Sequence, residues 1–450
     1  MIDRLRPAIA PAYLFLCLLL GGSAQGVWAN AFLRLAAVGI IAWALLERRE
    51  EPLPRAAKQL LALVGLTLLL AVLQLIPLPI SIWASLPGRG QFLEGFRLLG
   101  VAPVALTLSL APYDSVATLL ALLPPLGMLA ATIGLRGYSA GWLAAALIAG
   151  TVAGVLLGIL QVTSTNPLAS PWYFYRQSNF GVATGFFANS NHMASLLLVS
   201  IPFIAALGAT VRERAKDLRL RSAALALVGG GLVVVVFGLA LNGSLAGYGL
   251  GLPVVLASLL MLFGAQTRFA RVGAVAIGLA SLVALVLLWT SPVSRGAVTS
   301  VSSRQAMLEK SLELVGEYGP AGSGLGTFEK VYRMGENPAA VDRYYVNHAH
   351  DDYLELAVET GLPGIILMLL FLAWWGQAVW RMLRSPASSH FAVAAAIASA
   401  AVMLHSAVDY PLRTAAMSAV FAMCLALILQ SRRSVQSDSD LRPARHLVVG

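Results

Sequence analysis

The densest polar stretch of the chain, residues 342–355, holds side chains that could do acid/base or metal chemistry. His348 and His350 stand close to Asp351 and Asp352. A histidine can act as a general acid or base near neutral pH, and an arginine such as Arg343 can hold an anionic substrate. The two histidines and two aspartates are also chemically suitable metal ligands, although their spacing is not diagnostic. A solvated polar loop would look the same, so three interpretations stay open.

Arg304 is a candidate anion ligand ahead of that stretch. Ser302 and Gln305 have the spacing of a capping box, and apolar residues follow at helical period, which predicts a short helix beginning near Ser302. An arginine in the first turn opposes the helix dipole. It could therefore be merely exposed, or it could bind an anion together with free backbone N–H groups.

An unusually aromatic segment, residues 162–190, contains Arg176 and leads into Asn189, Asn191 and His192. Aromatic side chains favour the membrane interface, and their faces also suit sugar rings. The segment is therefore either an interfacial belt or a surface for a sugar substrate.

Asp409 follows an apolar run at 391–408, with Arg413 shortly after it. An ionisable residue at membrane depth is a functional hypothesis by default. The alternative is that Asp409 and Arg413 simply pair with each other at the interface.

Composition shows what kind of molecule must position these residues. Of 450 residues, 58% are hydrophobic and only 12% are charged, and the mean hydropathy is +0.78. A soluble fold cannot bury so much apolar sequence, so the bilayer must act as its solvent. The net charge of +10 is spread over loops between apolar runs, which is typical of membrane topology signals and argues against nucleic-acid binding. Cys17 and Cys424 lie in apolar runs and form no disulfide or metal pattern.

Apolar runs predict about twelve transmembrane helices in an all-α integral membrane protein. We place them near 8–27, 30–46, 59–79, 115–134, 139–161, 191–210, 223–241, 245–264, 272–291, 361–380, 391–408 and 414–430. Arginines and lysines alternate so that the basic loops fall on one side, which predicts an inner-membrane protein with both termini cytoplasmic. His350 then lies on the opposite, periplasmic side.

One large periplasmic loop, residues 292–360, is expected to contain short helices. Its glycine-rich stretch, residues 319–328, lacks the βαβ setting of a dinucleotide fingerprint. We therefore expect a tight turn that packs the loop onto the membrane domain. We divide the chain into residues 1–180, with the first five helices and the aromatic loop; residues 181–430, the main membrane domain; and residues 431–450, a disordered cytoplasmic tail.

Two stretches resemble the O-antigen ligase and polymerase superfamily. His350 and Asp351, followed by nine residues and then Gly361-Leu362-Pro363-Gly364, resemble its signature of a His, then Asn, Ser or Gln, and then Gly-x-x-Gly opening a helix. The segment from Gly185 to Ala194 is similar to its Gly-x-Phe-x-Asn-x-Asn-His-x-Ala stretch. The similarity covers roughly residues 180–430.

This resemblance implies a C-type membrane glycosyltransferase fold and an inverting reaction without metal or other cofactor. Members transfer a glycan from a polyprenyl-pyrophosphate carrier to a growing polysaccharide or to lipid A core, and other polysaccharide export proteins are further candidate partners. His350 would be the base that activates the acceptor hydroxyl. Arg304 would hold the pyrophosphate, and His348, Arg343, Arg176, Asn189, Asn191, His192, Asp351 and Asp409 are further candidates for substrate binding.

Two departures from the family pattern stand out. Asp351 occupies the position of Asn, Ser or Gln, and its carboxylate is expected to favour protonated His350, a weaker base. Leu245 stands where an arginine is usual, so Arg176 or Arg343 could replace it. Polymerase and ligase are not separated by these residues. A transporter or flippase, and a structural scaffold, are the alternatives outside the enzyme class.

Overall fold

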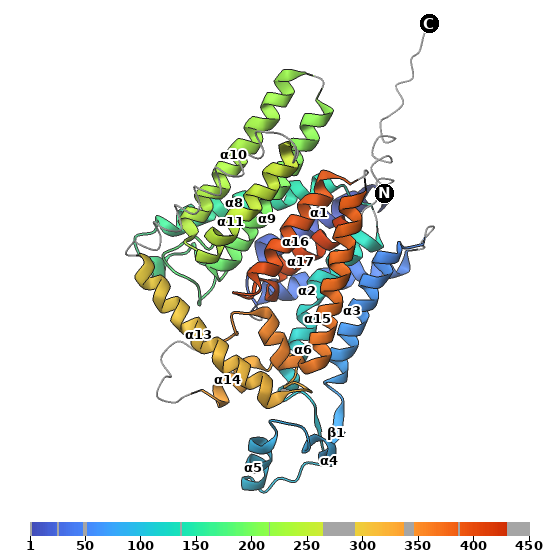
Figure 1. The fold of residues 1–450 in the computed structure, drawn as a ribbon, viewed down its shortest axis with the longest axis vertical. Helices are drawn as coiled ribbons and strands as arrows, with labels where there is room; N and C mark the ends of the chain where they lie inside the picture. Colours follow the sequence, from blue (N-terminus) through green and yellow to red (C-terminus); the bar gives the residue numbers. More distant parts are fainter. Residues whose placement is uncertain are drawn as a thin grey trace.

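The protein is a bundle of helices, with the segments 77–107 and 293–334 lying toward one end (Figure 1). The computed structural model describes residues 2–24, 27–47, 52–135, 137–215, 217–263, 293–336, 346–385 and 388–429. Within them, eight helical segments are long and apolar enough to cross a membrane, and three further apolar helices are shorter. The chain is therefore a multi-pass helical membrane protein, as the sequence predicts.

The apolar helices follow the predicted runs closely. The eight longer segments are α2 (Trp28–Leu46), α3 (Arg55–Leu73), the broken span Pro112–Gly134, α8 (Ala140–Val162), α9 (Ser190–Arg214), α10 (Leu218–Asn242), α11 (Leu245–Phe263) and α15 (Asp352–Arg384). The broken span consists of α6 (Pro112–Ala121), α7 (Leu123–Leu129) and the π-helical turn Ala130–Gly134. The shorter ones are α1 (Ile2–Leu20), α16 (His390–His405) and α17 (Ala415–Ile428). The predicted run at 272–291 and the tail at 431–450 lie outside the described residues.

α9 occupies the middle of the bundle because its sequence is apolar or small on every side as far as Gly208. It contacts α8, α10, α11 and α16, and most of its residues are buried. A helix that is apolar all round has no face suited to water. The residues at the start of α9 are therefore held by neighbours on several sides.

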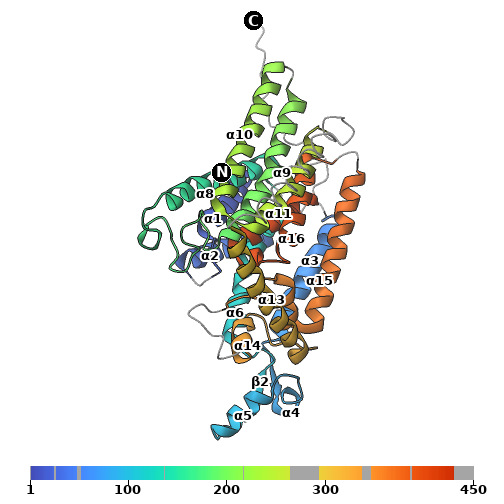
Figure 2. The same cartoon turned by 60° about the vertical axis from the view of Figure 1, so that its left-hand side comes forward.

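The predominantly helical chain, which agrees with the expected all-α class, also contains one small β unit. β1 (Pro77–Pro79) pairs antiparallel with β2 (Ala105–Thr107), and the short helices α4 (Ile80–Trp83) and α5 (Gly90–Leu98) lie between them. Figure 2 shows this small unit projecting beyond α6 and α14. The fully buried Arg89 donates hydrogen bonds to the carbonyls of Leu108 (2.9 Å) and Gly322 (3.2 Å). It thereby ties the unit to the glycine-rich turn.

The large loop contains a long helix rather than only short ones. α13 runs from Val293 to Tyr318, and α14 (Phe328–Met334) follows it. The predicted start near Ser302 is wrong, because the capping-box residues fall inside α13. Leu314 and Tyr318 of α13 pack with Phe328 of α14 and Val358 of α15 in a small buried cluster.

The glycine-rich turn packs the loop onto the membrane domain, as predicted. The N–H groups of Ser323 and Gly324 donate to the carbonyls of Val358 (3.0 Å) and Glu359 (2.8 Å). α15 is kinked at this contact, where Gly361 has φ 59° and ψ −150°. A Cβ on Gly361 would lie 2.1 Å from the carbonyl oxygen of Pro320. Only glycine permits both this conformation and this approach.

Candidate functional site

His350 sits in a strained conformation immediately before α15. Its φ of 52° is the only positive φ of a non-glycine residue in the described ranges. L-residues rarely adopt this region, and such strain concentrates at functional sites. The helix that follows is fixed by Asp351, whose Oδ1 accepts hydrogen bonds from the N–H groups of Tyr353 (2.9 Å) and Leu354 (3.0 Å).

Asp351 therefore has a different environment from the one predicted. Asn, Ser and Asp are all good N-cap residues, so the carboxylate can replace the family's usual residue in this structural role. Burial raises the pKa of Asp351, and the two backbone N–H groups partly oppose that rise. The carboxylate that faces the His350 ring is instead that of Asp409.

Asp409 lies between α16 and the 3₁₀ turn Pro411–Arg413, and it is fully buried. Its Oδ1 lies 3.3 Å from Nδ1 of His350, at ion-pair distance, and also accepts the N–H of Tyr410 at 2.8 Å. Nδ2 of Asn191 donates to its Oδ2. Burial alone would raise the pKa of Asp409, but His350 and the nearby His192 and His405 outweigh it and hold this pKa well below its usual range.

Tyr410 forms the centre of an aromatic cluster with three histidines. Its ring centroid lies 5.0 Å from His350, 4.2 Å from His348 and 5.0 Å from His192. Its hydroxyl accepts a hydrogen bond from Nδ2 of Asn189 at 3.4 Å. Burial, followed by the charge of Asp409, raises the pKa of Tyr410 well above its usual value, so the phenol stays neutral. All three histidine rings therefore contact the same phenol ring.

The start of α9 supplies the second wall of the site. Asn189 caps this helix by accepting the N–H of Asn191 at 2.8 Å. Oδ1 of Asn191 accepts from the hydroxyl of Ser244 at 2.7 Å, while its amide group faces Asp409. The carboxylate beside His350 is therefore positioned by a side chain from α9, which is itself held from the start of α11.

A charge cluster lies next to the histidines. Arg413 faces three carboxylates of α15, with N–O separations of 3.4 Å to Asp352, 3.2 Å to Glu355 and 3.4 Å to Glu359. The alternative interpretation, in which Asp409 and Arg413 simply pair with each other, is therefore wrong. Burial would lower the pKa of the Arg413 guanidinium, but the carboxylates outweigh burial and raise it.

His348 belongs to this cluster through Glu355. Its Nδ1 lies 2.9 Å from Oε1 of Glu355, and the N–H of Ala349 donates to the other oxygen at 3.0 Å. Burial would lower the pKa of His348, but the charge and hydrogen bond of Glu355 outweigh it and raise the pKa. His348 is thereby favoured as a cation that holds the segment before α15.

The residues of the metal interpretation do not converge. Asp351 caps α15, Asp352 faces Arg413 and His348 faces Glu355. Among the residues that the structure describes, no group of three or more His, Cys, Asp or Glu side chains is arranged to hold a metal ion.

Residues 221–369 match the family model described as O-Antigen ligase. The resemblance to the O-antigen ligase and polymerase superfamily is confirmed. The match includes His350, Asp351 and the Gly361 kink, and it lies within the predicted domain 181–430. No curated protein matches the chain. The family indicates an activity of the O-antigen ligase or polymerase type.

Several of the predicted site residues lie together, and two of them, His348 and His350, fall within the matched segment 221–369. His348, His350, Asn189, Asn191, His192 and Asp409 share Tyr410 or one another as neighbours. Of the three candidate arginines, the structure describes the side chain of Arg176 alone. Arg176 is exposed on the aromatic loop, and Arg343 lies outside the described residues. Arg304 lies within α13 rather than in its first turn, so the argument from free N–H groups fails, and its side chain is outside the described part.

Sequence reasoning missed Tyr410 as the centre of the site. Its position beside Asp409 was the available signal. It also missed the contribution of Ser244, because its contact with Asn191 joins residues far apart in the chain. Ser195 and His405, whose Oγ and Nδ1 lie 2.7 Å apart, form a further buried contact behind the site.

Proposed function

We propose that the chain transfers a glycan from a polyprenyl-pyrophosphate carrier to an acceptor hydroxyl, with His350 as the base. The observation that carries this proposal is the strained His350 beside the buried carboxylate of Asp409, within an O-antigen ligase segment. A histidine held by a carboxylate at one ring nitrogen can use the other nitrogen for proton transfer.

The proposed reaction follows from the two ring nitrogens. Asp409 favours the tautomer with the proton on Nδ1, 3.3 Å away, so Nε2 is left as the acceptor. Nε2 takes the proton of the acceptor hydroxyl as its oxygen attacks the anomeric carbon. The bond from that carbon to the phosphate oxygen breaks, and polyprenyl pyrophosphate leaves as an anion. Attack opposite the leaving group inverts the anomeric centre.

Most other candidate residues position the base in this scheme. Asn191 orients Asp409, Asn189 holds Tyr410, and His192 packs its ring edge-on against Tyr410. A hydroxyl or sugar ring reaching His350 would also be near His348. We assign the pyrophosphate to arginine side chains, for which the resemblance suggests Arg304, with Arg343 and Arg176 as further candidates.

We also propose the location and division of the chain from its topology signals. The site faces the periplasm, the protein spans the inner membrane, and both termini are cytoplasmic. The acceptor is a growing polysaccharide or lipid A core. Residues 1–180 and 181–430 form the two membrane parts, and the latter carries the chemistry.

Purified protein reconstituted with a polyprenyl-pyrophosphate glycan tests the assignment. His350→Ala is expected to lose transfer by 10²-fold or more, since general base catalysis typically contributes 10²–10⁴-fold. The matched control is His390→Ala. His390 lies at the start of α16, at the opposite end of that helix from His405 near the site, and its Nε2 lies 2.8 Å from Oε1 of Glu213. Full activity in His350→Ala removes the proposed base. Addition of EDTA should leave the rate unchanged, and a loss would show that a metal is needed.

Deletion strains separate the remaining functions. Unpolymerised carrier-linked units should accumulate if the protein is a polymerase, and long carrier-linked chains with bare core if it is a ligase. Vesicle uptake that survives His350→Ala would instead favour the transporter alternative.

A further inference from the structure

Arg34 is a cation inside a candidate membrane span that the proposed reaction does not use. It lies in the second turn of α2 and is the only charged residue between positions 30 and 46. Its side chain is half-buried. A charged residue at this depth is costly, and it is usually paired or serves a functional site.

No carboxylate in the described part of the chain faces Arg34. Across the ranges that the structure describes, Arg34 makes no ion pair or hydrogen bond with another side chain. The carboxylates of Asp352, Glu355 and Glu359 are occupied by Arg413 instead. No anion among the described residues therefore supplies the counter-charge of Arg34.

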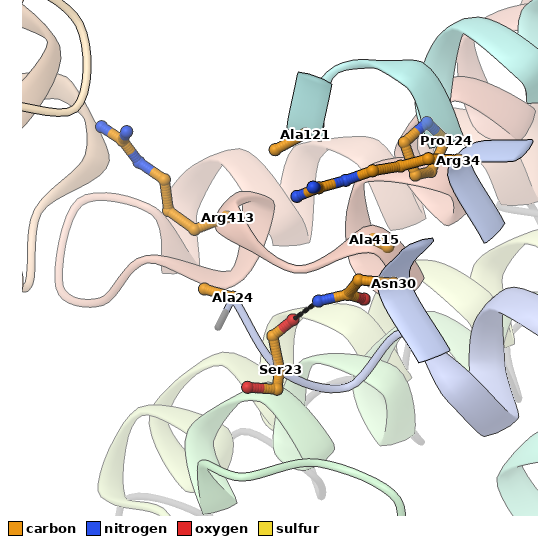
Figure 3. Close-up of a pocket in the computed structure, with 8 residues that line it drawn as sticks. All are labelled: Ser23, Ala24, Asn30, Arg34, Ala121, Pro124, Arg413 and Ala415. Carbon is orange, nitrogen blue, oxygen red and sulfur yellow. Dashed lines mark hydrogen bonds between the residues drawn. The ribbon is translucent and has the colours of Figure 1, made fainter. Parts of the chain in front are cut away.

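A small pocket that opens to its surroundings lies at the Arg34 side chain. Its wall includes Ser23, Asn30, Ala121, Pro124, Arg413 and Ala415. Figure 3 shows Arg34 reaching into the space between Ala121 and Ala415, whereas the guanidinium of Arg413 points away from it. Among the described residues, the pocket thus contains the Arg34 guanidinium without a paired anion, beside the neutral polar Ser23 and Asn30 and several small or apolar side chains.

The pocket lies at the same end of the bundle as His350. The carbonyls of Gly21 and Gly22, in the loop before α2, accept hydrogen bonds from Ala416 (3.0 Å) and Ala188 (3.1 Å). Ala416 lies in the first turn of α17, and Ala188 directly precedes Asn189, the N-cap of α9. The segment from Asp409 to Arg413 belongs to both places, because its first residue contacts His350 and its last lines the pocket.

We propose that the Arg34 pocket binds a phosphate group of a lipid. A guanidinium matches phosphate geometry with two parallel hydrogen bonds, and near a membrane surface phosphate is the abundant anion. The phosphate comes either from a phospholipid headgroup of the bilayer or from the pyrophosphate of the carrier. Only the second source rests on the proposed function.

Native mass spectrometry of the full chain in a phosphate-free detergent separates the two sources. One arm adds glycan-free polyprenyl pyrophosphate, and the other adds phosphatidylglycerol. Arg34→Ala is expected to weaken binding of one lipid by about tenfold or more, which is the loss of one charge-assisted contact. Arg34→Lys should lose less, because it keeps the charge but not the planar fork. Arg55→Ala is the control, since Arg55 is the exposed first residue of α3.

The outcomes are distinct. Weaker binding of the pyrophosphate alone identifies the carrier as the source, and weaker binding of phosphatidylglycerol alone identifies the bilayer. Unchanged binding of both lipids, or an equal loss in Arg55→Ala, overturns the proposal. If Arg34→Ala does not fold, a second measurement compares the wild type with Arg34→Lys. Inorganic pyrophosphate should displace bound lipid from the wild type and should displace less of it from Arg34→Lys. Equal displacement from both proteins overturns the proposal. The two proposals can fail separately. If lipid binding depends on Arg34 but glycan transfer does not depend on His350, the pocket proposal holds and the proposed function is wrong.

Discussion

Removing the charge of Arg413 should destabilise the junction of α15 with the α16–α17 segment. The guanidinium is 18% exposed, whereas the side chains of Asp352, Glu355 and Glu359 are 11%, 2% and 0% exposed. At an effective dielectric constant of about 20, a pair 3.4 Å apart has a gross attraction of about 5 kcal/mol. Desolvation and the repulsion among the carboxylates offset much of this. Removing one partner of a buried ion pair costs about 3–5 kcal/mol, and we expect that loss for Arg413→Met.

The measurement is reversible unfolding in mixed micelles at neutral pH. Arg381→Ala is the control, because Arg381 is exposed in the last turn of α15, far from the three carboxylates near the start of that helix. In the Arg413→Met background, Glu359→Gln should restore part of the lost stability, because it removes one uncompensated carboxylate. The loss should also shrink at acidic pH, where carboxyl groups can take up protons.

Two results would refute this reasoning. One is an Arg413→Met protein within 1 kcal/mol of the Arg381→Ala control, about the contribution of a surface pair. The other is a Glu359→Gln change that destabilises Arg413→Met further, which would mean that the carboxylates are held by other cations.

Three further outcomes are expected from unfolding measurements. Asp351→Ala should lose about 1 kcal/mol with the N-cap of α15 while Asp351→Asn keeps most of it, and equal losses would contradict the capping role. Gly322→Ala should lower the free energy of unfolding by well over 1 kcal/mol, because Gly322 has φ 83° and a Cβ there would lie 2.6 Å from the carbonyl oxygen of Glu359. The control is Gly376→Ala at a helical glycine with open space around it, which should be neutral or stabilising. Protonated His348 should stabilise the fold through Glu355. This stabilisation should be complete below the unfolded-state pKa of about 6.5 and should be lost as the pH rises through the raised folded-state pKa of His348. A stability difference between wild type and His348→Gln that does not change with pH would contradict this role.

The membrane helices were predictable because the signal is local. Each long apolar run must satisfy its own backbone in lipid, and a helix does so within one segment. The boundary between α10 and α11 was also predictable, because a glycine separates the two apolar runs. In the structure this glycine, Gly243, ends α10 with φ 71°. By contrast, the capping box at Ser302 predicted a helix start inside α13, because residues that can cap a helix are also tolerated within one.

The site was only half predictable, because its contacts join distant segments. The sequence indicated His350 as a candidate base. Nothing local shows that Asp409 would face His350 while Arg413 would turn to α15. Arg34 was readable in principle as a charge inside an apolar run, but its pocket depends on the loop that packs against α17.

The left-handed backbone of His350 changes what a substitution at this position measures. Alanine would keep the backbone strain, about 1–2 kcal/mol for an L-residue, while removing the ring contacts with Asp409 and Tyr410. Glycine would remove the same contacts and release the strain. The usual ranking of alanine above glycine should therefore be reversed here, and an inactive glycine variant should fold at least as well as the alanine variant. The loop thus holds its histidine at the expense of stability, and selection for stability alone would drive the residue away from histidine.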